Sequence, residues 1–383
     1  MSNLKLKLVA IYYGNPQSGV NKKVIYQVQG LAKSGIDATL VFLGNKREGD
    51  VFTHDFITFL PTKTPPYKSF LDKLGALRSL RQSYEKVLLE GDPNEIIYLR
   101  NYVPAFWFYR AVKKSKKTVV LEMPSNHFQE ALSRKSYVFY LSLCLFHKPI
   151  LRNVDLIISV ISEVIYKHFD PEKYHIPTMV IGNGIQVEAV PLRKATTLAT
   201  SDTFTFTCVA ELSLPHGIDR LLHGLKAYKG NEAIKLNVVG KGPQLKRLED
   251  LVSKLSLTNV VFHGFLSGEK LDAILEQTDL AIGALAIHRS NIEYASILKA
   301  REYCARGIPF INSGKDEEFP ERFPFVQAIK SNEDPIDVAS TVEFLKKVVQ
   351  IPDYKMRMRD YATNVLSWDI KMKKLAEYLH KTN

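Results

Sequence analysis

The chain alternates short apolar segments with longer segments of helical periodicity along almost its whole length. Strands that alternate with helices in this way pair in parallel and carry helices on both faces of the sheet. At 383 residues the chain is about twice as long as an ordinary domain. We therefore expect an α/β protein with two doubly wound domains. The expected strands are residues 4–12, 37–43, 95–99, 118–123, 154–160 and 178–181 in the first half, and 203–210, 234–239, 259–263 and 279–284 in the second.

The two halves are separated by a change in composition. Residues 182–185 (Gly-Asn-Gly-Ile) predict a tight turn, and residues 187–202 form an irregular stretch that contains Pro191 and several Thr, Ser and Ala residues. Such a stretch is typical of a linker. The expected parts are an N-terminal domain of residues 1–190, a linker of residues 191–202, a C-terminal domain of residues 203–366, and a final helix of residues 367–383 that packs back on the N-terminal domain.

The net charge indicates the class of binding partner, and the cysteines indicate the cellular compartment. A formal net charge of +12 favours an anionic partner, such as a membrane surface or a phosphorylated substrate. The aromatic and basic motifs of RNA-binding modules are missing, so nucleic acid is not an expected partner. Cys144, Cys208 and Cys304 are widely spaced in apolar runs, which is typical of buried thiols in a reducing compartment. The longest apolar run, residues 137–146, is too short to cross a bilayer.

Two helical segments of the first half combine basic and apolar side chains. Residues 67–89 and residues 134–152 each contain five Lys, Arg or His residues beside Leu, Phe and Tyr. A basic amphipathic helix binds the interface of an anionic membrane, so we expect a cytoplasmic protein attached to the inner face of the membrane. The alternative is that both helices only cover a sheet and extend their lysine stems outward.

A short helix in the second half is predicted from residues 296–306. It ends at Gly307, a residue suited to a left-handed helix stop, and Pro309 and a further strand follow. The N-terminus of this helix faces the carboxyl edge of a parallel sheet, where it favours a phosphate group. Lys299 and Glu302 are three residues apart and share one face of the helix. The alternative is an ordinary amphipathic helix with an intrahelical Lys–Glu pair.

Other polar residues follow expected strands of the first half. The loop of residues 14–19 follows the first strand and contains Gly14 and Gly19, which allow a ligand to approach the backbone closely. The loop lacks the GxGxxG spacing of dinucleotide-binding folds, and a plain connection is an alternative. The polar residues at the ends of later strands either bind an acceptor or serve as loop and cap residues. The candidate acceptor-binding residues are Arg100, Glu122, Asn126 and His127.

Three motifs in the second half occur in a recognisable order: residues 240–243 (Gly-Lys-Gly-Pro), residues 259–265, and residues 302–309. Together they resemble the retaining family-4 glycosyltransferases of the GT-B fold, in which two Rossmann-like domains face each other across a cleft. The turn at residues 182–185 is similar to the interdomain signature of that family. Residues 216–220 and 98–100 resemble the branch that builds bacterial cell-surface polysaccharides. The resemblance covers the whole chain and is stronger in the second half.

The resemblance implies that the C-terminal domain binds a nucleotide-diphosphate sugar. In such enzymes the carboxylate that corresponds to Glu302 binds the ribose diol, and the amides at the start of its helix bind the phosphates. The fold normally works without a metal ion, and no cofactor is implied. The implied donor-binding residues are Gly14, Gly19, Glu211, His216, Gly217, Gly240, Gly242, Pro243, Phe265, Leu266, Tyr294, Ser296, Ile297, Leu298 and Glu302.

The chain departs from the family pattern where the leaving diphosphate is stabilised. The family usually has an Arg and a Lys at the positions of Glu211 and His216, and the first carboxylate of its Glu-x7-Glu pair falls at Tyr294. Other cations must then substitute, and the neighbouring Glu293 must replace the missing carboxylate. The candidate catalytic residues are Arg220, Lys241, Glu293 and Lys299, with Arg289 and Arg301 as further cations.

The leading hypothesis is a hexosyltransferase that retains anomeric configuration and extends a lipid-linked surface glycan. Retention is usually ascribed to attack from the face that the nucleotide leaves, which needs no enzyme nucleophile. Two alternatives are a catalytically silent scaffold or partner subunit of the same fold that binds nucleotide, and a nucleotide-sugar epimerase. An epimerase needs a general acid–base pair, and Glu122 and His127 do not form a clear one in the sequence.

Overall fold

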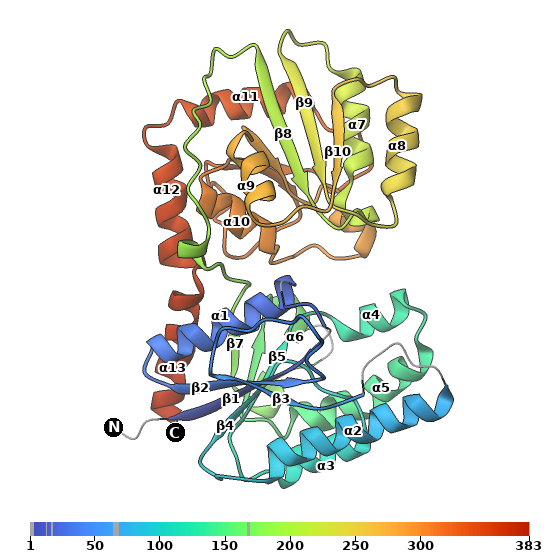
Figure 1. Ribbon diagram of the computed structural model, residues 1–383, viewed down its shortest axis with the longest axis vertical. Coiled ribbons are helices and arrows are strands. Elements are labelled where there is room, and N and C mark those ends of the chain that lie inside the picture. The colour runs from blue at the N-terminus through green and yellow to red at the C-terminus, as the bar shows by residue number, and fades with distance from the viewer. Residues whose placement is uncertain (1–3, 13, 17, 64–68, 167–168, 383) are drawn as a thin grey trace. The chain divides into compact units, whose positions relative to one another are not determined.

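The computed structural model describes residues 4–12, 14–16, 18–63, 69–166 and 169–382. The chain divides into two compact units, each built on one parallel sheet (Figure 1). The first unit contains residues 1–182 and 368–383, and the second contains residues 183–367. Residues 191–202, the expected linker, therefore lie in the second unit.

The first unit contains a seven-stranded sheet in the order β3-β2-β1-β4-β5-β6-β7, and every strand pair in it is parallel. The central strands are buried on both faces, as expected for a sheet that is covered by helices on both sides. The strands are β1 (Lys5–Ile11), β2 (Asp37–Leu43), β3 (Ile57–Leu60), β4 (Ile96–Leu99), β5 (Val119–Met123), β6 (Leu156–Ser159) and β7 (Thr178–Val180). The helices are α1 (Gly19–Lys33), α2 (Phe70–Leu89), α3 (Phe106–Lys114), α4 (His127–Ser133), α5 (Tyr137–Leu151), α6 (Ser162–Tyr166) and α13 (Trp368–Thr382).

The last helix, α13, completes the core of the first unit although it is distant in sequence. It packs against α1 (Figure 1). The two helices approach closely at Gly30, where a Cβ atom would lie 2.9 Å from the Cβ of Met372 and 3.0 Å from the carbonyl oxygen of Trp368. Trp368 and Met372 are both buried in the same hydrophobic cluster as strands β1 and β2.

The second unit contains a six-stranded parallel sheet in the order β10-β9-β8-β11-β12-β13. Its strands are β8 (Thr203–Val209), β9 (Ala233–Val239), β10 (Val260–Gly264), β11 (Leu280–Ile282), β12 (Phe310–Ser313) and β13 (Val326–Ile329). Its helices are α7 (Ile218–Ala227), α8 (Leu245–Lys254), α9 (Glu269–Glu276), α10 (Leu298–Arg306), α11 (Val338–Val349) and α12 (Tyr354–Tyr361), which continues into a π-helical turn over residues 362–366.

The structure differs from the sequence-based expectation in two respects. The helical segment expected over residues 134–152 begins only at Tyr137, because Lys135 takes a left-handed backbone with φ of 52° between α4 and α5. The edge strands β3 and β13 were not predicted. Each has only four residues, and such a length is too short for a periodic pattern to stand out.

Candidate functional site

Most residues expected to bind a donor gather at the carboxyl edge of the second sheet. They lie in the loops after β8, β9, β10 and β11 and at the N-terminus of α10. In the strand order β10-β9-β8-β11-β12-β13 the chain reverses direction between β8 and β11, and ligands of doubly wound sheets bind at such a switch point. Gly14 and Gly19 do not belong to this group. They lie after β1 in the first unit, and residue 17 of the same loop lies outside the described residues.

The loops after β8 and β11 lie side by side at this switch point. The amide of Leu285 donates to the carbonyl of His216 at 3.1 Å, and the amide of Ala286 donates to that of Pro215 at 3.0 Å. Gly217 allows the approach, because it has φ of 61° and a Cβ there would lie 2.8 Å from the Cβ of Ala286. The role of Gly217 in the structure is therefore to bring the two loops together.

Gly240 and Gly242 have a similar packing role. A Cβ at Gly240 would lie 1.8 Å from the carbonyl oxygen of Ala210, and one at Gly242 would lie 2.5 Å from the backbone of Leu212. The amide of Gly240 donates to the carbonyl of Gly264 at 2.7 Å. The loop after β9 is thus pressed against the loop after β8, backbone to backbone, and Pro243 follows it at the surface.

Lys299 projects from the first turn of α10 into the switch point. Its ammonium donates to the carbonyl of Gly283 at 2.9 Å, directly after β11. Burial lowers the pKa of Lys299, and the nearby thiol of Cys208 opposes that shift. No carboxylate is paired with this lysine among the residues that the structure describes, and the carbonyl of Gly283 accepts its hydrogen bond.

His216 is uncharged at neutral pH. Burial lowers its pKa to about 3, and the positive charge of Lys299 adds to this shift. Its Nδ1 lies 2.9 Å from Oγ of Ser213. The cation that the family usually has at this position is therefore absent from His216, whereas Lys299 supplies one close by.

The N-terminus of α10 is held in place by its preceding residues. The amide of Asn183 donates to Oγ of Ser296 at 2.6 Å, and its side-chain Nδ2 donates to the Ser296 carbonyl at 2.6 Å. Ile297 precedes the helix in an extended conformation, and no side chain caps the helix. The amides of Leu298 and Lys299 therefore lack intrahelical acceptors, as an anion-binding terminus requires, whereas the amide of Ala300 donates to the Ile297 carbonyl at 3.1 Å.

Glu302 lies one turn further along α10. Its Oε1 accepts from Nε and Nη2 of Arg306 at 3.0 and 2.8 Å, and Arg306 also pairs with Asp272 at 2.5 Å. The side chain of Glu302 is half-buried, and its Oε2 has no hydrogen bond to the residues that the structure describes. One oxygen is thus fixed by an arginine while the other is open.

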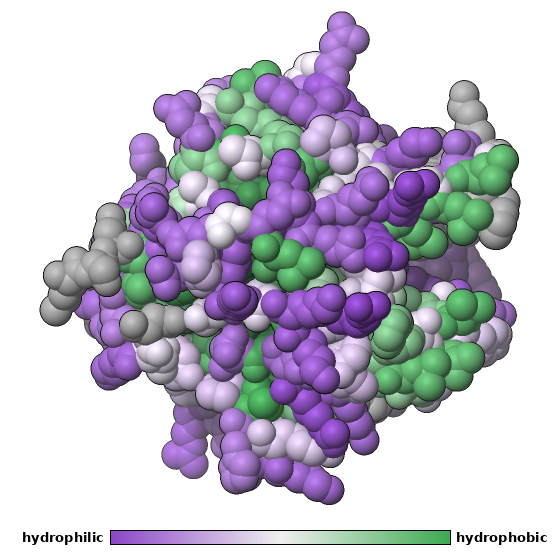
Figure 2. Space-filling model, turned by 90° about the horizontal axis from the view of Figure 1, so that it is seen from below, coloured by the Kyte–Doolittle hydropathy of each residue, from purple (hydrophilic) through white to green (hydrophobic). Residues whose placement is uncertain are grey.

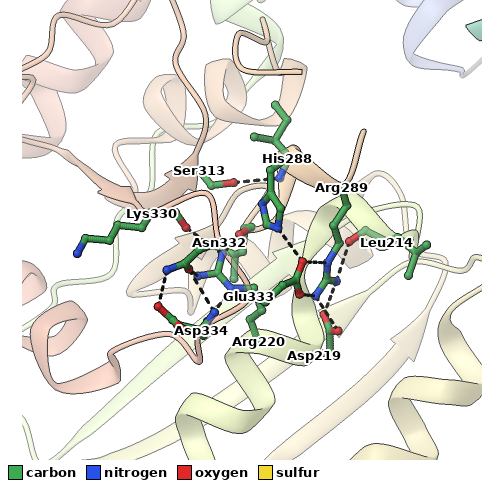
Figure 3. A network of polar contacts seen from close by, with 12 residues as sticks. Leu214, Asp219, Arg220, His288, Arg289, Ser313, Lys330, Asn332, Glu333 and Asp334 are labelled. Atoms are coloured by element: carbon green, nitrogen blue, oxygen red, sulfur yellow. Dashed lines mark hydrogen bonds and ion pairs between the residues drawn. The ribbon is translucent and has the colours of Figure 1, made fainter. Parts of the chain in front are cut away.

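Arg220 belongs to a network that anchors the loop after β13 (Figure 3). It is buried at the start of α7, and its guanidinium donates to the carbonyls of Asp334 at 2.7 Å and Lys330 at 3.1 Å, to the carbonyl of Leu285, and to Oδ1 of Asn332 at 2.7 Å. Figure 3 shows these acceptors arranged around it. The described contacts of Arg220 are therefore structural.

Two further cations named in the sequence analysis, Arg289 and Arg301, are held by carboxylates. Arg289 pairs with Asp219 at 2.8 Å and with Glu333 at 2.5 Å, and both carboxylates lie beside it in Figure 3. Arg301 is fully buried and pairs with Asp316 and with Glu318 at 2.6 Å. Neither guanidinium carries a charge that is free of a partner. Lys299 differs from both in this respect.

The remaining candidates lie at the surface of the second unit. Glu293 pairs with Lys315 at 2.7 Å, and the ammonium of Lys315 lies 5.4 Å from the ring centroid of Tyr294. Lys241 and Glu211 are exposed, and Leu266 is half-buried. Phe265, directly after β10, exposes 67 % of its surface. An exposed ring at this edge is unusual for a packing residue and suits stacking on a flat ligand.

The four candidate acceptor residues lie near the carboxyl ends of β4 and β5 in the first unit. Glu122 is buried, and its two oxygens accept from Lys23 at 2.7 Å, Tyr98 at 2.7 Å and Gln27 at 3.1 Å. Together the two cations Lys23 and Arg100 outweigh the effect of burial and lower the pKa of Glu122 to about 2. The guanidinium of the buried Arg100 makes none of these hydrogen bonds to Glu122.

The other two candidates have local partners. Asn126 caps α4 by accepting from the amide of Gln129 at 3.1 Å. His127 packs its ring 5.0 Å from that of Tyr102, and burial lowers its pKa, so it is neutral at physiological pH. Glu122 and His127 do not contact each other in any described interaction, which agrees with the weak case for an acid–base pair.

The sequence analysis missed Lys23, Gln27 and Tyr98. Lys23 and Gln27 are one turn apart on α1, beside the apolar row of Val24, Val28 and Leu31, and all of these are buried. Two polar residues at that spacing on the core side of a helix are a signal for a buried partner on the sheet.

Comparisons with known proteins agree with this geometry. Residues 192–364 match the family described as Glycosyl transferases group 1. A comparison with curated protein sequences gives no significant match.

Several solved structures are similar over nearly the whole chain. Sucrose-phosphate synthase from Thermosynechococcus elongatus superposes with a TM-score of 0.70 at 15 % identity, covering 99 % of both chains. HepE from Anabaena, solved with UDP and glucose, has a TM-score of 0.66 at 14 % identity, covering 99 % of this chain and 100 % of its own. WaaG, described as a glycosyltransferase involved in lipopolysaccharide biosynthesis, has a TM-score of 0.60 at 14 % identity, covering 98 % and 99 %. The expectation of a GT-B fold with two Rossmann-like domains is confirmed.

Proposed function

We propose that the chain transfers a hexose from a nucleotide-diphosphate sugar to a surface-polysaccharide acceptor, with retention of configuration, and the match of residues 192–364 to the glycosyl transferases group 1 supports this. The observation that carries the proposal is Lys299. It places an ammonium without a carboxylate partner at the switch point between β8 and β11, next to the open N-terminus of α10. Both features attract the diphosphate of a sugar nucleotide.

In the proposed reaction the bond between the anomeric carbon and the diphosphate oxygen breaks, and negative charge grows on the diphosphate. Lys299 and the amides at the start of α10 stabilise that charge. They take the role of the two cations that the family usually has at the positions of Glu211 and His216. The acceptor hydroxyl attacks from the face that the nucleotide leaves and passes its proton to the leaving oxygen. This scheme keeps the anomeric configuration and uses no enzyme nucleophile.

The nucleoside is proposed to bind next to the diphosphate. The open Oε2 of Glu302 accepts from a ribose hydroxyl, and the exposed ring of Phe265 stacks on the base. Support for a hexose comes from HepE, which was solved with UDP and glucose, and support for a surface-polysaccharide acceptor comes from the description of WaaG.

We also propose that the first unit docks on an anionic membrane, where a lipid-linked acceptor is located. Helices α2 and α5 expose large apolar side chains: Leu71 (76 %), Leu74 and Leu77 on α2, and Tyr137, Val138 (82 %), Leu141 and Leu145 on α5. In Figure 2 hydrophobic groups gather among hydrophilic ones on the side where α2 begins and α5 lies in Figure 1. Residues 67 and 68 of the expected basic segment lie outside the described residues.

Basic side chains accompany this apolar surface. Lys73, Arg78 and Arg81 on α2 and Lys148 on α5 are exposed, whereas Tyr84 and His147 point into the core. Apolar groups flanked by cations are the composition that binds the interface of anionic lipids. No helix among the described residues has both the length and the apolar character that a membrane span requires.

The neutral His216 and the acidic Glu211 also favour a second candidate, a catalytically silent scaffold of the same fold that binds nucleotide. A single experiment separates the two functions. Thermal stabilisation of the protein by UDP-, GDP-, dTDP- and ADP-sugars, followed by an assay for slow hydrolysis of the bound sugar, shows binding and turnover independently. Binding with turnover supports the transferase, whereas tight binding without turnover at any acceptor supports the scaffold.

A further inference from the structure

A cluster of buried polar side chains lies beneath the carboxyl edge of the first sheet. Lys23 and Gln27 come from α1, Tyr98 from β4, Glu122 from β5, and Arg100 follows β4 directly. Each of the five exposes less than a tenth of its surface. Lys23 and Glu122 form an ion pair at 2.7 Å, and Tyr98 and Gln27 donate to the remaining oxygen of Glu122.

The charges of this cluster do not balance. Lys23 and Arg100 carry two positive charges, and Glu122 carries one negative charge whose oxygens all have donors already. Arg100 exposes 8 % of its surface, and its Nε has no hydrogen-bond partner among the described residues. The guanidinium makes one hydrogen bond to the described residues, from Nη1 to Oδ1 of Asn101 at a long 3.5 Å. A buried guanidinium normally has a carboxylate or several carbonyl acceptors, because removing it from water is costly.

Arg301 and Arg220 in the second unit show what a buried arginine with a structural role looks like. Arg301 has two carboxylates and two backbone carbonyls, and Arg220 has three carbonyls and a side-chain amide oxygen. Among the described residues the guanidinium of Arg100 has neither a carboxylate nor a backbone carbonyl as acceptor, and its one side-chain contact is the long one to Asn101. Its missing partner is therefore not explained by the packing of the first unit.

The position of Arg100 adds an independent argument. In the order β3-β2-β1-β4-β5-β6-β7 the chain reverses between β1 and β4, so this is the switch point of the first sheet. Arg100 is the first residue after β4, and its amide donates to the carbonyl of Val9 in β1 at 3.0 Å. Ligands of doubly wound sheets bind outside the strands at this place.

We infer that Arg100 binds an oxyanion, a phosphate or carboxylate group of the acceptor, at the switch point of the first unit. The inference deepens the proposed function, since it names the chemistry of the acceptor. Glu122 is a positioning residue. It accepts hydrogen bonds from Lys23, Gln27 and Tyr98, so the guanidinium of Arg100 is the group of the cluster that remains to bind the anion. A lipid diphosphate and an acidic sugar both carry an oxyanion of this kind.

The test measures binding of small anions to the full chain by isothermal titration calorimetry. Inorganic phosphate, pyrophosphate and acetate are the probes, and Arg100→Gln is compared with wild type and with Arg322→Gln, which removes an exposed arginine of the second unit. Arg100→Gln is expected to weaken binding of the preferred anion about tenfold, because it removes a charge-assisted hydrogen bond, and Arg322→Gln is expected to leave it unchanged. Equal affinity in wild type and Arg100→Gln would overturn the inference.

Two further measurements keep the inference testable if Arg100→Gln does not fold. Arg100→Lys keeps the charge but loses the planar fork, so anion binding is expected to weaken by a smaller factor. Glu122→Gln raises the excess to two positive charges, and anion binding is expected to tighten, an effect that a purely structural cluster would not produce. Unchanged affinity in both variants would also overturn the inference.

Nucleotide-sugar binding is measured on the same samples. Normal sugar-nucleotide binding together with unaltered anion affinity in the variants refutes only the anion site. Loss of anion binding in Arg100→Gln by a protein that binds no sugar nucleotide supports the site and refutes the proposed transferase. Preference for phosphate or pyrophosphate over acetate points to a lipid-linked phosphate, whereas preference for acetate points to an acidic sugar.

Discussion

The switch points of the two units have the same topology and differ in how they are built. In the second unit the site is made largely of backbone: glycines press the loops together, the helix end of α10 is open, and Lys299 adds one cation. In the first unit it is made of buried side chains, with Lys23, Glu122 and Arg100 at its centre.

The difference fits the proposed ligands of the two units. Every donor carries a diphosphate, so a helix end and close backbone approach serve for all of them. Acceptors differ from one another, and a unit that must recognise a particular acceptor needs side chains that are specific for it. The comparison teaches that a binding site built from backbone leaves glycine motifs in the sequence, whereas a site built from side chains depends on contacts between distant residues.

The largest expected effect comes from removing the cation of the second unit. Lys299→Met is expected to lower the rate of sugar transfer or donor hydrolysis about 100-fold to 1,000-fold, because stabilisation of the leaving diphosphate is lost. Steady-state kinetics with the preferred sugar nucleotide measure this. Lys254→Met, at the exposed C-terminal end of α8, is the control. A rate within a few-fold of wild type would show that the N-terminus of α10 stabilises the leaving diphosphate without Lys299.

The buried ion pair of the first unit affects stability instead. Glu122→Gln leaves Lys23 without a negative partner and is expected to lower the free energy of unfolding at pH 7 by about 3 kcal/mol. Denaturant unfolding of both proteins measures the difference. A loss of less than 1 kcal/mol would mean that water reaches the pair.

The carboxylate of Glu122 also makes the free energy of unfolding depend on pH. Its folded pKa of about 2 is below the ordinary value of 4.5, so the stabilisation is fully present above about pH 4.5 and is lost as the pH falls towards 2. Wild type is expected to lose stability over this range more steeply than Glu122→Gln. Parallel curves from pH 5 to pH 2.5 would contradict the assignment.

Glu302→Ala tests the open carboxylate of the donor site. Loss of the ribose acceptor is expected to weaken sugar-nucleotide binding about 10-fold to 100-fold, since hydrogen bonds to charged groups contribute about 1.5–3 kcal/mol. Calorimetric titration measures the change, and Glu249→Ala on the exposed face of α8 is the control. Unchanged affinity would show that the nucleoside does not bind next to Glu302 on α10.

The smallest expected effect is on membrane binding, which we expect for the surface of the first unit and not for that of the second. Leu74→Glu and Val138→Glu are expected to reduce co-sedimentation with vesicles that contain anionic lipid several-fold, and added salt is expected to reduce the binding of wild type. Val261→Glu places the same charge at an exposed position of the second unit and is expected to have no effect. Binding that is indifferent to salt and to all three substitutions would argue against docking by α2 and α5.

Much of the fold follows from local pattern in the sequence. The alternation of strands and helices predicted two parallel sheets, and the motifs at residues 240–243 and 302–309 predicted the GT-B fold. The motif glycines also lie where loops of the second unit meet, because only glycine tolerates the backbone approach seen at Gly217 and Gly240.

Other features could not be predicted from local pattern. Whether a cation is free depends on which acceptors fold next to it. The sequence offered Arg220 and Lys299 as candidates, and the structure surrounds Arg220 with acceptors, whereas Lys299 has no carboxylate partner among the described residues. The break between α4 and α5 rests on one left-handed residue, Lys135, in a segment whose side chains fit one continuous helix.

By itself the sequence determined the order of strands and helices, the two sheets and the glycine-rich edge of the second one, since these depend on neighbours along the chain. Only the tertiary structure decided the pairing of Lys23 with Glu122, the isolation of Arg100 and the charge state of His216. The physical reason is that electrostatic energy depends on distance and burial. Both quantities are set by residues that lie about 100 positions apart in the chain, as Lys23 and Glu122 do.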